Sequence, residues 1–337
     1  MEAKAPFRYN ECINGCERSE REKGVRFMAK ASLPEKTGRK GKYNREGLRL
    51  LLLALPFVLF VVAFSYVPLF GWIYAFTDYR AGMTLFDCQF VVLKHFQAIW
   101  ENRAEVIRVL RNTFALSFLG ILGSPLPVIF AILINEIRSS KFRKLVQTFT
   151  TLPNFISWIV VFTLCFAMFS TDGMVNGLLR RFGMDPMVNP LGNADCAWIF
   201  QWGLATWKSL GWSAIIYIAA IAGIDSELYD AAHVDGANRL QTILNVTVPG
   251  LYSTYFVLLL LSISNILSNG FDQYFVFYNP LTAEKLEVLD YYVYKIGVLT
   301  NNYPQSIALG MFKTVVSVTL LFTANRLSKK LRGESIV

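Results

Sequence analysis

The chain has 337 residues, of which 54% are hydrophobic and only 17% are charged, and its formal net charge is +9. This composition is too apolar for an ordinary soluble domain and predicts an integral membrane protein. The basic residues flank the apolar runs, where they act as topology determinants, so the net charge does not predict nucleic-acid binding. The five cysteines and two histidines lie scattered along the chain, which argues against a zinc or di-metal site.

The N-terminal residues are polar and predict a tail outside the membrane. Residues 1–27 have no apolar core of the kind found in signal sequences, and their composition predicts disorder. A second possibility is that translation starts at Met28, which opens a short basic leader. The predicted organisation is a cytoplasmic tail over 1–47, a membrane domain over 48–327 and a short cytoplasmic tail over 328–337.

Six apolar segments are long enough to cross a membrane, which takes about 20 mainly apolar residues. These segments are 50–73, 113–134, 149–169, 205–224, 252–267 and 306–324. The fifth is the weakest because it carries Ser262, Ser264, Asn265 and Ser268. The predicted fold class is therefore all-α, a polytopic membrane protein with six transmembrane helices.

The orientation follows from lysine and arginine residues close to the ends of these segments. Basic clusters lie at 36–49, 138–144 and 326–332, and with six spans all three fall on one side. We expect that side to be the cytoplasm, so that both termini and the polar segment 225–249 are cytoplasmic. A few arginines between the spans fall on the outer side and weaken the bias without reversing it.

The segment 225–249 is polar and helix-prone, and it lies between the fourth and fifth spans. Ala231 and Ala232 favour helix, Gly236 permits a sharp turn between two short helices, and Pro249 marks the start of the next span. A membrane protein with such a polar element on its cytoplasmic side is expected to dock a partner there.

The spacing within this segment is similar to the EAA loop of binding-protein-dependent ABC importers. Asp230-Ala231-Ala232 is followed by three residues and Gly236, then by nine residues and Val246, and then by one residue and Val248-Pro249. In that family the loop is the permease element that docks the ATP-hydrolysing subunit. The residues that the resemblance assigns to this coupling are Glu227, Asp230, Ala231, Ala232, Asp235, Gly236, Ala237, Val246 and Pro249.

One position departs from the family pattern, which opens with glutamate. This chain has Asp230 there, one methylene shorter, with Glu227 one helical turn earlier. The resemblance implies that an acidic side chain at this place meets a basic residue of the ATPase. The alternative is that Glu227 and Asp230 favour a helix N-terminus through the helix dipole, which leaves the spacing of Gly236 and Pro249 unexplained.

Nearly all of the chain from about residue 48 onward resembles the sugar-import permeases, and among them the aldouronate and polysaccharide group. The stretches that carry this resemblance are 66–80, 111–114, 133–136, 147–157, 211–217, 292–294, 310–313 and 324–326. It implies a bacterial cell-membrane permease that forms a heterodimer with a second permease subunit. It also implies an ATP-binding subunit dimer in the cytoplasm and an extracellular solute-binding lipoprotein that delivers an oligosaccharide.

The chain lacks the glycine-rich sequence that cradles phosphates in ATPases. ATP and Mg²⁺ are therefore expected on the ATPase partner, and no cofactor is expected on this chain. The resemblance thus implies a transporter subunit and not an enzyme.

Polar residues inside spans are costly and tend to face a cavity or another helix. Those assigned to a solute path are Asn154, Ser157, Asn265, Asn269 and Lys313, with Asn135 and Asn325 as further candidates. Lys313 lies about 10 Å into the sixth span, from the helical rise per residue. It either faces the path and attracts a uronate or other acidic sugar, or it pairs with a carboxylate or a lipid headgroup.

Two aromatic groups each have two interpretations. Lys208 stands among Trp202, Trp207 and Trp212, which predicts an interfacial belt near the outer boundary in preference to a binding site. The segment 271–303 is rich in Phe and Tyr, whose faces stack on sugar rings and would contact the solute or the binding protein. Anchoring at the membrane interface explains the same residues.

The leading hypothesis is a permease subunit of an ABC importer for oligosaccharides, acidic ones of the aldouronate type among them. A membrane enzyme is disfavoured because the chain shows no set of catalytic residues. An ion-coupled secondary carrier usually has acidic residues within its spans, whereas here Asp and Glu lie almost wholly in loops. An ABC permease for another small polar solute is the remaining alternative.

Overall fold

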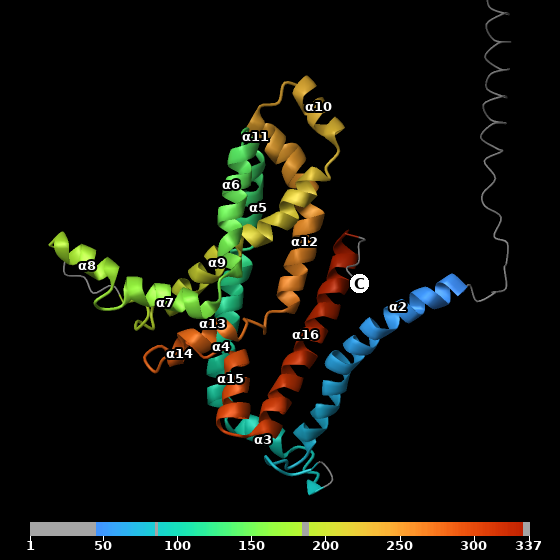
Figure 1. Ribbon diagram of the computed structural model, residues 1–337, viewed down its shortest axis with the longest axis vertical. Helices are drawn as coiled ribbons and strands as arrows, with labels where there is room; N and C mark the ends of the chain where they lie inside the picture. The colour runs from blue at the N-terminus through green and yellow to red at the C-terminus, as the bar shows by residue number, and fades with distance from the viewer. Residues whose placement is uncertain (1–44, 85–86, 184–188, 333–337) are drawn as a thin grey trace, which may run out of the picture. The chain divides into compact units, whose positions relative to one another are not determined.

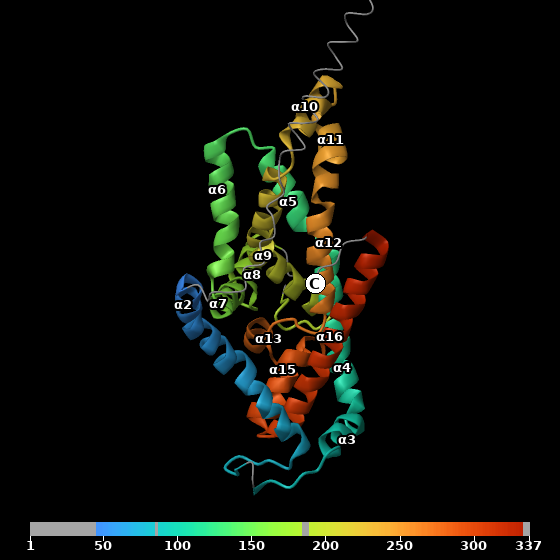
Figure 2. The same ribbon diagram turned by 90° about the vertical axis from the view of Figure 1, so that its right-hand side faces the viewer.

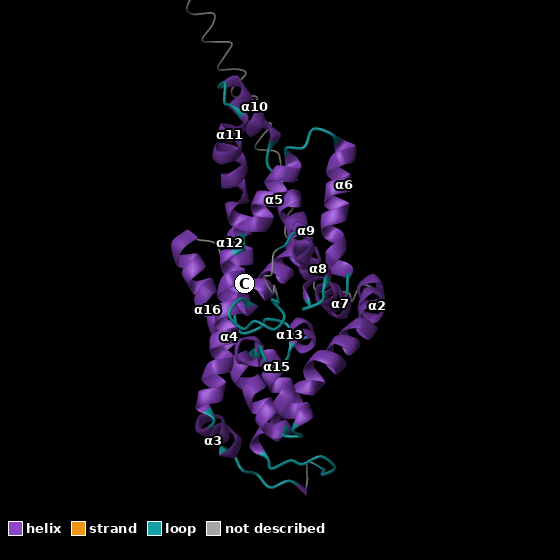
Figure 3. Ribbon diagram, turned by 90° about the vertical axis from the view of Figure 1, so that its left-hand side faces the viewer, coloured by secondary structure: helices purple, strands orange, loops and turns teal. Residues whose placement is uncertain are grey.

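The computed structural model describes residues 45–84, 87–183 and 189–332. Within these ranges the chain is helical and has no strand, apart from an isolated bridge between Thr77 and Phe90 (Figure 3). The all-α prediction is therefore confirmed for the described part of the chain.

The chain divides into two compact units, Met1–Tyr66 and Val67–Val337, which are described separately. Most of the tail predicted over 1–47 lies outside the described residues. The last helix continues through the first residues of the tail predicted over 328–337.

The described part of the first unit consists of α2 (Arg45–Val61) and a π-helical turn, η1 (Val62–Tyr66). From Gly47 to Tyr66 its side chains are exposed, although nearly all of them are apolar. A helix that is apolar on every side is stable where lipid or another protein surrounds it. This segment therefore belongs in a membrane.

The second unit begins with a 3-10 helix, η2 (Val67–Phe76), and a short helix, α3 (Lys94–Glu101). The next elements are α4 (Arg103–Leu122), α5 (Pro125–Asn135), α6 (Ser140–Thr151), η4 (Leu152–Phe155), α7 (Trp158–Phe169) and α8 (Met174–Arg181). They are followed by α9 (Ala197–Ala222), α10 (Ser226–Val234), α11 (Arg239–Thr242), η5 (Ile243–Thr247), α12 (Val248–Ser264), α13 (Asp272–Phe277), α14 (Ala283–Leu286), α15 (Leu289–Tyr294), η6 (Lys295–Leu299) and α16 (Tyr303–Arg332). In this unit α10 and α11 lie at one end and α3 lies at the other (Figures 1 and 2).

Six helical segments in the described residues are long and apolar enough to cross a membrane, as predicted. They are Gly47–Phe76, Arg103–Asn135, Trp158–Arg181, Ala197–Ala222, Arg239–Ser264 and Tyr303–Arg326. The number of spans is therefore confirmed, whereas several boundaries differ from the prediction.

The third predicted span, 149–169, is not one continuous helix. The helix α6 ends at Thr151, the 3-10 turn η4 contains Pro153, and the backbone at Ser157 is extended. The Ser157 hydroxyl then starts α7 by accepting the backbone amide of Val160 at 3.4 Å. Proline cannot donate a backbone hydrogen bond and a serine N-cap begins a new helix, so the apolar run is broken here.

The second, fourth and fifth spans begin eight or more residues earlier than hydropathy predicted, the second at Arg103 and not at 113. The fourth begins with α9 at Ala197 and not at 205, and the fifth runs from Arg239 through α11, η5 and α12. Pro249 lies near the start of α12, directly after the π-helical turn η5. A proline ring clashes with the carbonyl four residues earlier, and the wider π-turn accommodates it.

Separate apolar clusters between neighbouring helices form the core of the second unit. One cluster packs α5 and α9 against α12 and includes Ala131, Ala214 and Leu251. Another joins α4 to α15 and α16 and includes Val109 and Leu289. These contacts fix the positions of α4, α9 and α12, the helices that surround the candidate site.

Candidate functional site

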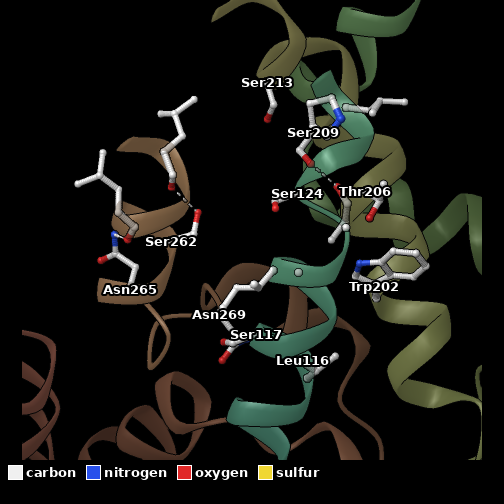
Figure 4. Close-up of a pocket in the computed structure, with 18 of the residues that line it drawn as sticks. Leu116, Ser117, Ser124, Trp202, Thr206, Ser209, Ser213, Ser262, Asn265 and Asn269 are labelled. Carbon is white, nitrogen blue, oxygen red and sulfur yellow. Dashed lines mark hydrogen bonds between the residues drawn. The ribbon is translucent and has the colours of Figure 1, made fainter. Parts of the chain in front are cut away.

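A cavity of about 620 Å³ lies between α4, α9 and α12 (Figure 4). Its polar lining residues are Ser117, Ser124, Thr206, Ser209, Ser213, Ser262, Asn265, Ser268, Asn269 and Gln273. Its aromatic lining residues are Trp202, Trp212, Tyr217 and Tyr274. In Figure 4, Ser262 and Asn265 at the end of α12 lie across the cavity from Thr206 and Trp202 of α9. A cavity of this size suits a small organic ligand.

None of the described residues that line this cavity is charged. The hydroxyls of Ser209 and Ser262 donate to carbonyls of their own helices, at 2.8 and 2.9 Å. Their oxygen atoms therefore remain available as hydrogen-bond acceptors. The indole rings of Trp202 and Trp212 add flat apolar faces. A wall of this kind suits a polyhydroxylated solute better than a bare ion.

Two polar atoms of the lining residues are buried without a hydrogen-bond partner among the described residues. They are the indole Nε1 of Trp202 and the amide Oδ1 of Asn269. Leaving such a group unsatisfied costs about 1–3 kcal/mol. The Trp202 ring packs against Gly123, where an added Cβ would lie 3.0 Å from Nε1. Both atoms are closed to solvent, so the groups that a solute in the cavity can reach are the exposed hydroxyls and amides of the wall, such as those of Ser262, Asn265 and Ser268.

The structure brings two of the five residues assigned to a solute path into this cavity, Asn265 and Asn269. Asn154, Ser157 and Lys313 are not among the residues that line it. The backbone carbonyl of Asn154 accepts a hydrogen bond from a lysine of α9, and Ser157 caps α7. These two residues therefore have local structural roles at the break between α6 and α7.

Sequence reasoning missed the part of the wall that α9 contributes. Trp202, Thr206, Ser209 and Ser213 follow one another at intervals of four, three and four residues. In a helix this spacing places them on one face. A polar stripe of this spacing in an otherwise apolar helix is the signal that could have located the wall.

Lys313 forms an ion pair with Asp290 of α15. The other carboxylate oxygen of Asp290 accepts the backbone amides of Asn269, at 3.1 Å, and Gly270, at 3.2 Å. Lys313 therefore has a carboxylate partner within the chain, which is the second of the two alternatives left open by the sequence.

Lys208 lies in the middle of α9 and not near the end of a span. It follows the first helical residue, Ala197, by eleven positions, which is about 16 Å along the axis. Its Nζ donates to the carbonyl of Asn154 at 2.6 Å and lies 5.5 Å from the centre of the Trp158 ring. The prediction took the span to begin at 205, whereas α9 begins at Ala197, so Lys208 lies farther from the helix end than predicted. The lysine instead supplies a cation to the carbonyl end of η4.

The segment predicted to dock a partner forms the two short helices α10 and α11, with Gly236 at the turn between them. Gly236 has a φ of +75°. The amides of Gly236 and Ala237 donate to the carbonyls of His233 and Ala232, at 3.1 and 2.9 Å. This pair of bonds is the Schellman motif, which needs a left-handed residue where the helix ends. The predicted turn at Gly236 is confirmed.

Both helices of this segment also begin on a capping side chain. Asp225 accepts the backbone amide of Glu227 at 3.0 Å at the start of α10. Asn238 and Gln241 cap one another's backbone amides at the start of α11, at 2.8 and 2.9 Å. Capping of this kind stabilises a helix end by about 1 kcal/mol. Residues 225–242 therefore form a well-defined elbow.

The outer surface of the elbow combines acidic and apolar side chains. Glu227, Asp230 and Asp235 are exposed, and none of them forms an ion pair with another described residue. Val234 is 88% exposed, and Leu240 is exposed as well. Charged and apolar groups that face solvent together at the end of a unit are typical of an interaction surface.

A buried carboxylate that sequence reasoning did not single out connects α4 to η6. Glu287 is 1% exposed and accepts Arg108 at 2.5 Å and Lys295 at 2.7 Å. Glu105 lies 3.5 Å from Arg108 and 3.8 Å from Lys295. Burial alone would lower the pKa of Lys295, but the hydrogen bond and the charge of Glu287 raise this pKa above its usual value. The cluster fixes the region between α13 and α16 against α4.

The aromatic segment 271–303 belongs largely to the core. Tyr274, Phe277, Tyr291 and Tyr292 are buried, and among them Tyr274 also lines the cavity. A broad aromatic contact surface, one of the two sequence interpretations, is therefore wrong for Phe277, Tyr291 and Tyr292, whereas Tyr274 faces the cavity. Hydropathy could not separate the alternatives, because the same residue types occur in cores, at interfaces and in sugar sites.

Together these features define a multi-pass membrane protein with an uncharged polar cavity among its helices and a capped elbow at one end. The chain belongs to the family of binding-protein-dependent transport system inner membrane components, which it matches over residues 123–333. It is therefore a permease component of the cytoplasmic membrane, in a family of transport proteins.

Two relatives and one solved structure are similar over most of their length. The chain is 37% identical over 292 residues to the polygalacturonan/rhamnogalacturonan transport system permease protein YteP of Bacillus subtilis (strain 168), covering 85% of this chain and 89% of the relative. It is 35% identical over 289 residues to Protein LplB of the same organism, covering 85% and 90%. A crystal structure of a bacterial alginate ABC transporter, in complex with an alginate pentasaccharide-bound periplasmic protein, contains a similar chain. That chain has a TM-score of 0.78 and 32% identity, with coverage of 86% of this chain and 97% of that one.

Proposed function

We propose that this chain is the permease subunit of an ABC importer and forms the path for oligosaccharides, including acidic ones built from uronic acids. The observation that carries the proposal is the cavity wall of hydroxyls, amides and two indole rings, in which no described residue is charged. Hydroxyl groups and ring faces are what neutral and acidic sugars have in common. The relatives support the choice, since polygalacturonan and alginate are polymers of uronic acids.

The mechanism that we propose is mechanical. The elbow docks a separate ATPase subunit that binds ATP and Mg²⁺, with Glu227 and Asp230 facing its basic residues, and this chain binds no cofactor. The hydroxyls of Tyr229 in α10 and Thr247 in η5 lie 3.1 Å apart and join the elbow to the fifth span. That span continues to Ser262 in the cavity wall. Movement of the docked elbow is therefore transmitted along the fifth span to the cavity wall. The spans alternate in this way between inward-open and outward-open states.

The remaining partners in the proposal are a second permease subunit, a second copy of the ATPase subunit and an extracellular solute-binding lipoprotein. The family description, which names binding-protein-dependent transport, supports the last of these. The exposed apolar side chains of α2 and of the spans support lipid and a second permease as neighbours.

An ion-coupled carrier is the alternative class. Such a carrier would lose uptake when ion gradients are collapsed by ionophores, whereas the proposed importer keeps uptake as long as ATP is present.

The proposal places both termini and the elbow in the cytoplasm. Single cysteines at positions 140, 235 and 330, in an otherwise cysteine-free chain, should resist an impermeant maleimide in intact cells and react in inside-out vesicles. Gln97→Cys on α3, at the other end of the second unit, is the matched control and should react from outside. Labelling of any of the first three positions in intact cells would overturn this orientation.

The cavity wall gives a direct test of the solute path. Trp202→Leu removes an aromatic face of the wall, and about 1.5 kcal/mol of lost stacking corresponds to about a tenfold rise in the uptake KM. Trp207→Leu on the same helix is the control, since Trp207 is half-exposed and is not among the lining residues. Uptake of labelled trigalacturonate by the reconstituted complex measures the effect. If both variants changed the uptake KM equally, the cavity would not be part of the solute path.

A further inference from the structure

One turn of the chain supplies three residues to the cavity wall. The residues 265–270 connect α12 to α13, and Asn265, Ser268 and Asn269 all line the cavity. Gly270 ends the turn with a φ of +85°, a value that favours glycine. The placement of this turn therefore decides where a large part of the polar wall lies.

On its inner side the turn is fixed by Ser117 of α4. The Ser117 hydroxyl donates to the carbonyl of Ile266 at 2.6 Å and accepts the side-chain amide of Asn269 at 2.9 Å. Ser117 and Asn269 lie next to one another in Figure 4. The Asn269 side chain thus ties the turn to α4, and its carbonyl oxygen is buried.

On its other side the turn is fixed by Asp290. One oxygen of this carboxylate accepts the backbone amides of Asn269 and Gly270, at 3.1 and 3.2 Å. The other oxygen pairs with Lys313 of α16, and the side chains of Asp290 and Lys313 are 17% and 23% exposed. A carboxylate binds backbone amides more strongly than a neutral acceptor does, but an unpaired charge at such a site is costly. Lys313 therefore balances the charge of Asp290 and holds its carboxylate in place.

We propose that Asp290 and Lys313 are positioning residues for solute recognition, which hold the turn 265–270 in the wall of the cavity. Lys313 acts through Asp290 and the backbone of the turn, and it does not select a solute by its charge. The inference rests on the proposed function, since it assumes that the solute passes along this wall. It assigns the recognition of sugar hydroxyls to the exposed Asn265 and Ser268, which the turn presents to the cavity, and leaves the discrimination of acidic from neutral sugars to other parts of the transporter.

The first test compares an acidic with a neutral solute. The complete transporter is reconstituted in liposomes, and uptake is measured with trigalacturonate and with the same trisaccharide after reduction of its carboxylates to alcohols. Lys313→Met should raise the KM for both trisaccharides by about tenfold, the effect of one misplaced hydrogen-bonding group. A rise for trigalacturonate alone would overturn the inference, because it would mean that the lysine meets the solute carboxylate.

A neutral replacement of the whole pair provides the rescue. In the double variant Asp290→Asn/Lys313→Gln, the new asparagine oxygen can accept the two backbone amides while its amide group donates to the glutamine. Both trisaccharides should then regain a KM within about threefold of the wild type, which is the usual spread of context effects on one hydrogen bond. If Lys313 selects acidic solutes by charge, this neutral pair restores only the reduced trisaccharide.

Coupling between sites separates positioning from a general loss of packing. In an Asn265→Ala/Ser268→Ala/Asn269→Ala background, Lys313→Met should add no further rise in KM, because the side chains that the turn presents to the solute are already absent. Additive effects would overturn the inference. A wild-type complex that transports neither trisaccharide would reject the proposed function and the inference with it. A transporting wild type whose KM is unchanged by Lys313→Met would reject the positioning role alone.

Discussion

Replacing Gly236 by proline abolishes ATP-coupled uptake while leaving the spans inserted; this is the largest effect that we expect from a change in the elbow. Gly236 has a φ of +75°, whereas proline is restricted to about −65°. Proline also removes the amide that donates to the carbonyl of His233 at 3.1 Å. The local cost is about 3 kcal/mol or more, which is enough to displace α11 from its position after α10. The measurement is uptake by the reconstituted complex together with its ATPase activity.

A matched substitution at the same position keeps the geometry. Gly236→Asn should retain most of the activity, because asparagine tolerates the left-handed region better than other residues with a Cβ. Space does not limit this variant, since nothing lies within 4 Å of an added Cβ. Equal activity of the proline and asparagine variants, at equal amounts of complex in the membrane, would contradict the role of the turn in coupling.

The charge on the elbow can be tested separately from its shape. Asp230 is exposed and has no ion-pair partner among the described residues, so Asp230→Lys should not disturb the fold of the chain itself. It should nevertheless remove stimulation of the ATPase by the binding protein, and Asp230→Asn should have an intermediate effect. If the ATPase of the Asp230→Lys variant were still stimulated as in the wild type, the alternative interpretation would hold, in which Glu227 and Asp230 only favour a helix N-terminus.

The sequence predicted the features of the fold that depend on local composition. Six apolar runs correspond to six spans, and Gly236 between two helix-prone stretches corresponds to a turn between two helices. The ends of the spans were harder to predict, because hydropathy reports the polarity of side chains and not the conformation of the backbone. The break at 152–157 lies within an apolar run and depends on Pro153 and on Ser157, which were visible in the sequence but outweighed by their neighbours.

The candidate site depends on contacts that no local pattern contains. Lys313 and Asp290 lie in different helices, so the sequence could offer a paired lysine only as one of two alternatives. The buried Glu287 was likewise counted among loop residues, although two cations from other elements surround it. By contrast, the stripe that begins at Trp202 and ends at Ser213 has a regular helical spacing and was available to a search for polar faces within spans.

The close contact between α6 and α9 leads to the second large effect. Gly211 of α9 is buried, and an added Cβ would lie 2.2 Å from the carbonyl oxygen of Thr150 and 2.7 Å from the amide nitrogen of Thr151. These are backbone atoms at the end of a helix and cannot rotate away. One turn earlier on the same face of α9, Lys208 donates to the carbonyl of Asn154 and fixes the same region.

Gly211→Ala should therefore destabilise the chain strongly. Inserting a methyl group into such a contact costs about 1–3 kcal/mol by overpacking, and a collision with backbone atoms belongs at the upper end of that range. Separation of α9 from α6 also disturbs the cavity, because Trp212 lines it directly beside the substituted position. Lower thermal stability of the purified complex in detergent and loss of uptake are the expected results.

Gly203→Ala on the same helix is the control for this prediction. Gly203 is exposed, and nothing lies within 4 Å of an added Cβ. Alanine is also favoured over glycine in a helix by up to about 1 kcal/mol, so this variant should melt at the wild-type temperature or slightly above it. If Gly211→Ala had the same melting temperature as Gly203→Ala and transported normally, the α6–α9 contact would not limit stability. In that case α9 could move away from α6 at little cost in free energy. A large difference between the two variants would show that the α6–α9 contact limits stability. We then expect α6 and α9 to move together when the elbow, which follows α9, is displaced, and to carry the Trp202–Ser213 face of the cavity with them.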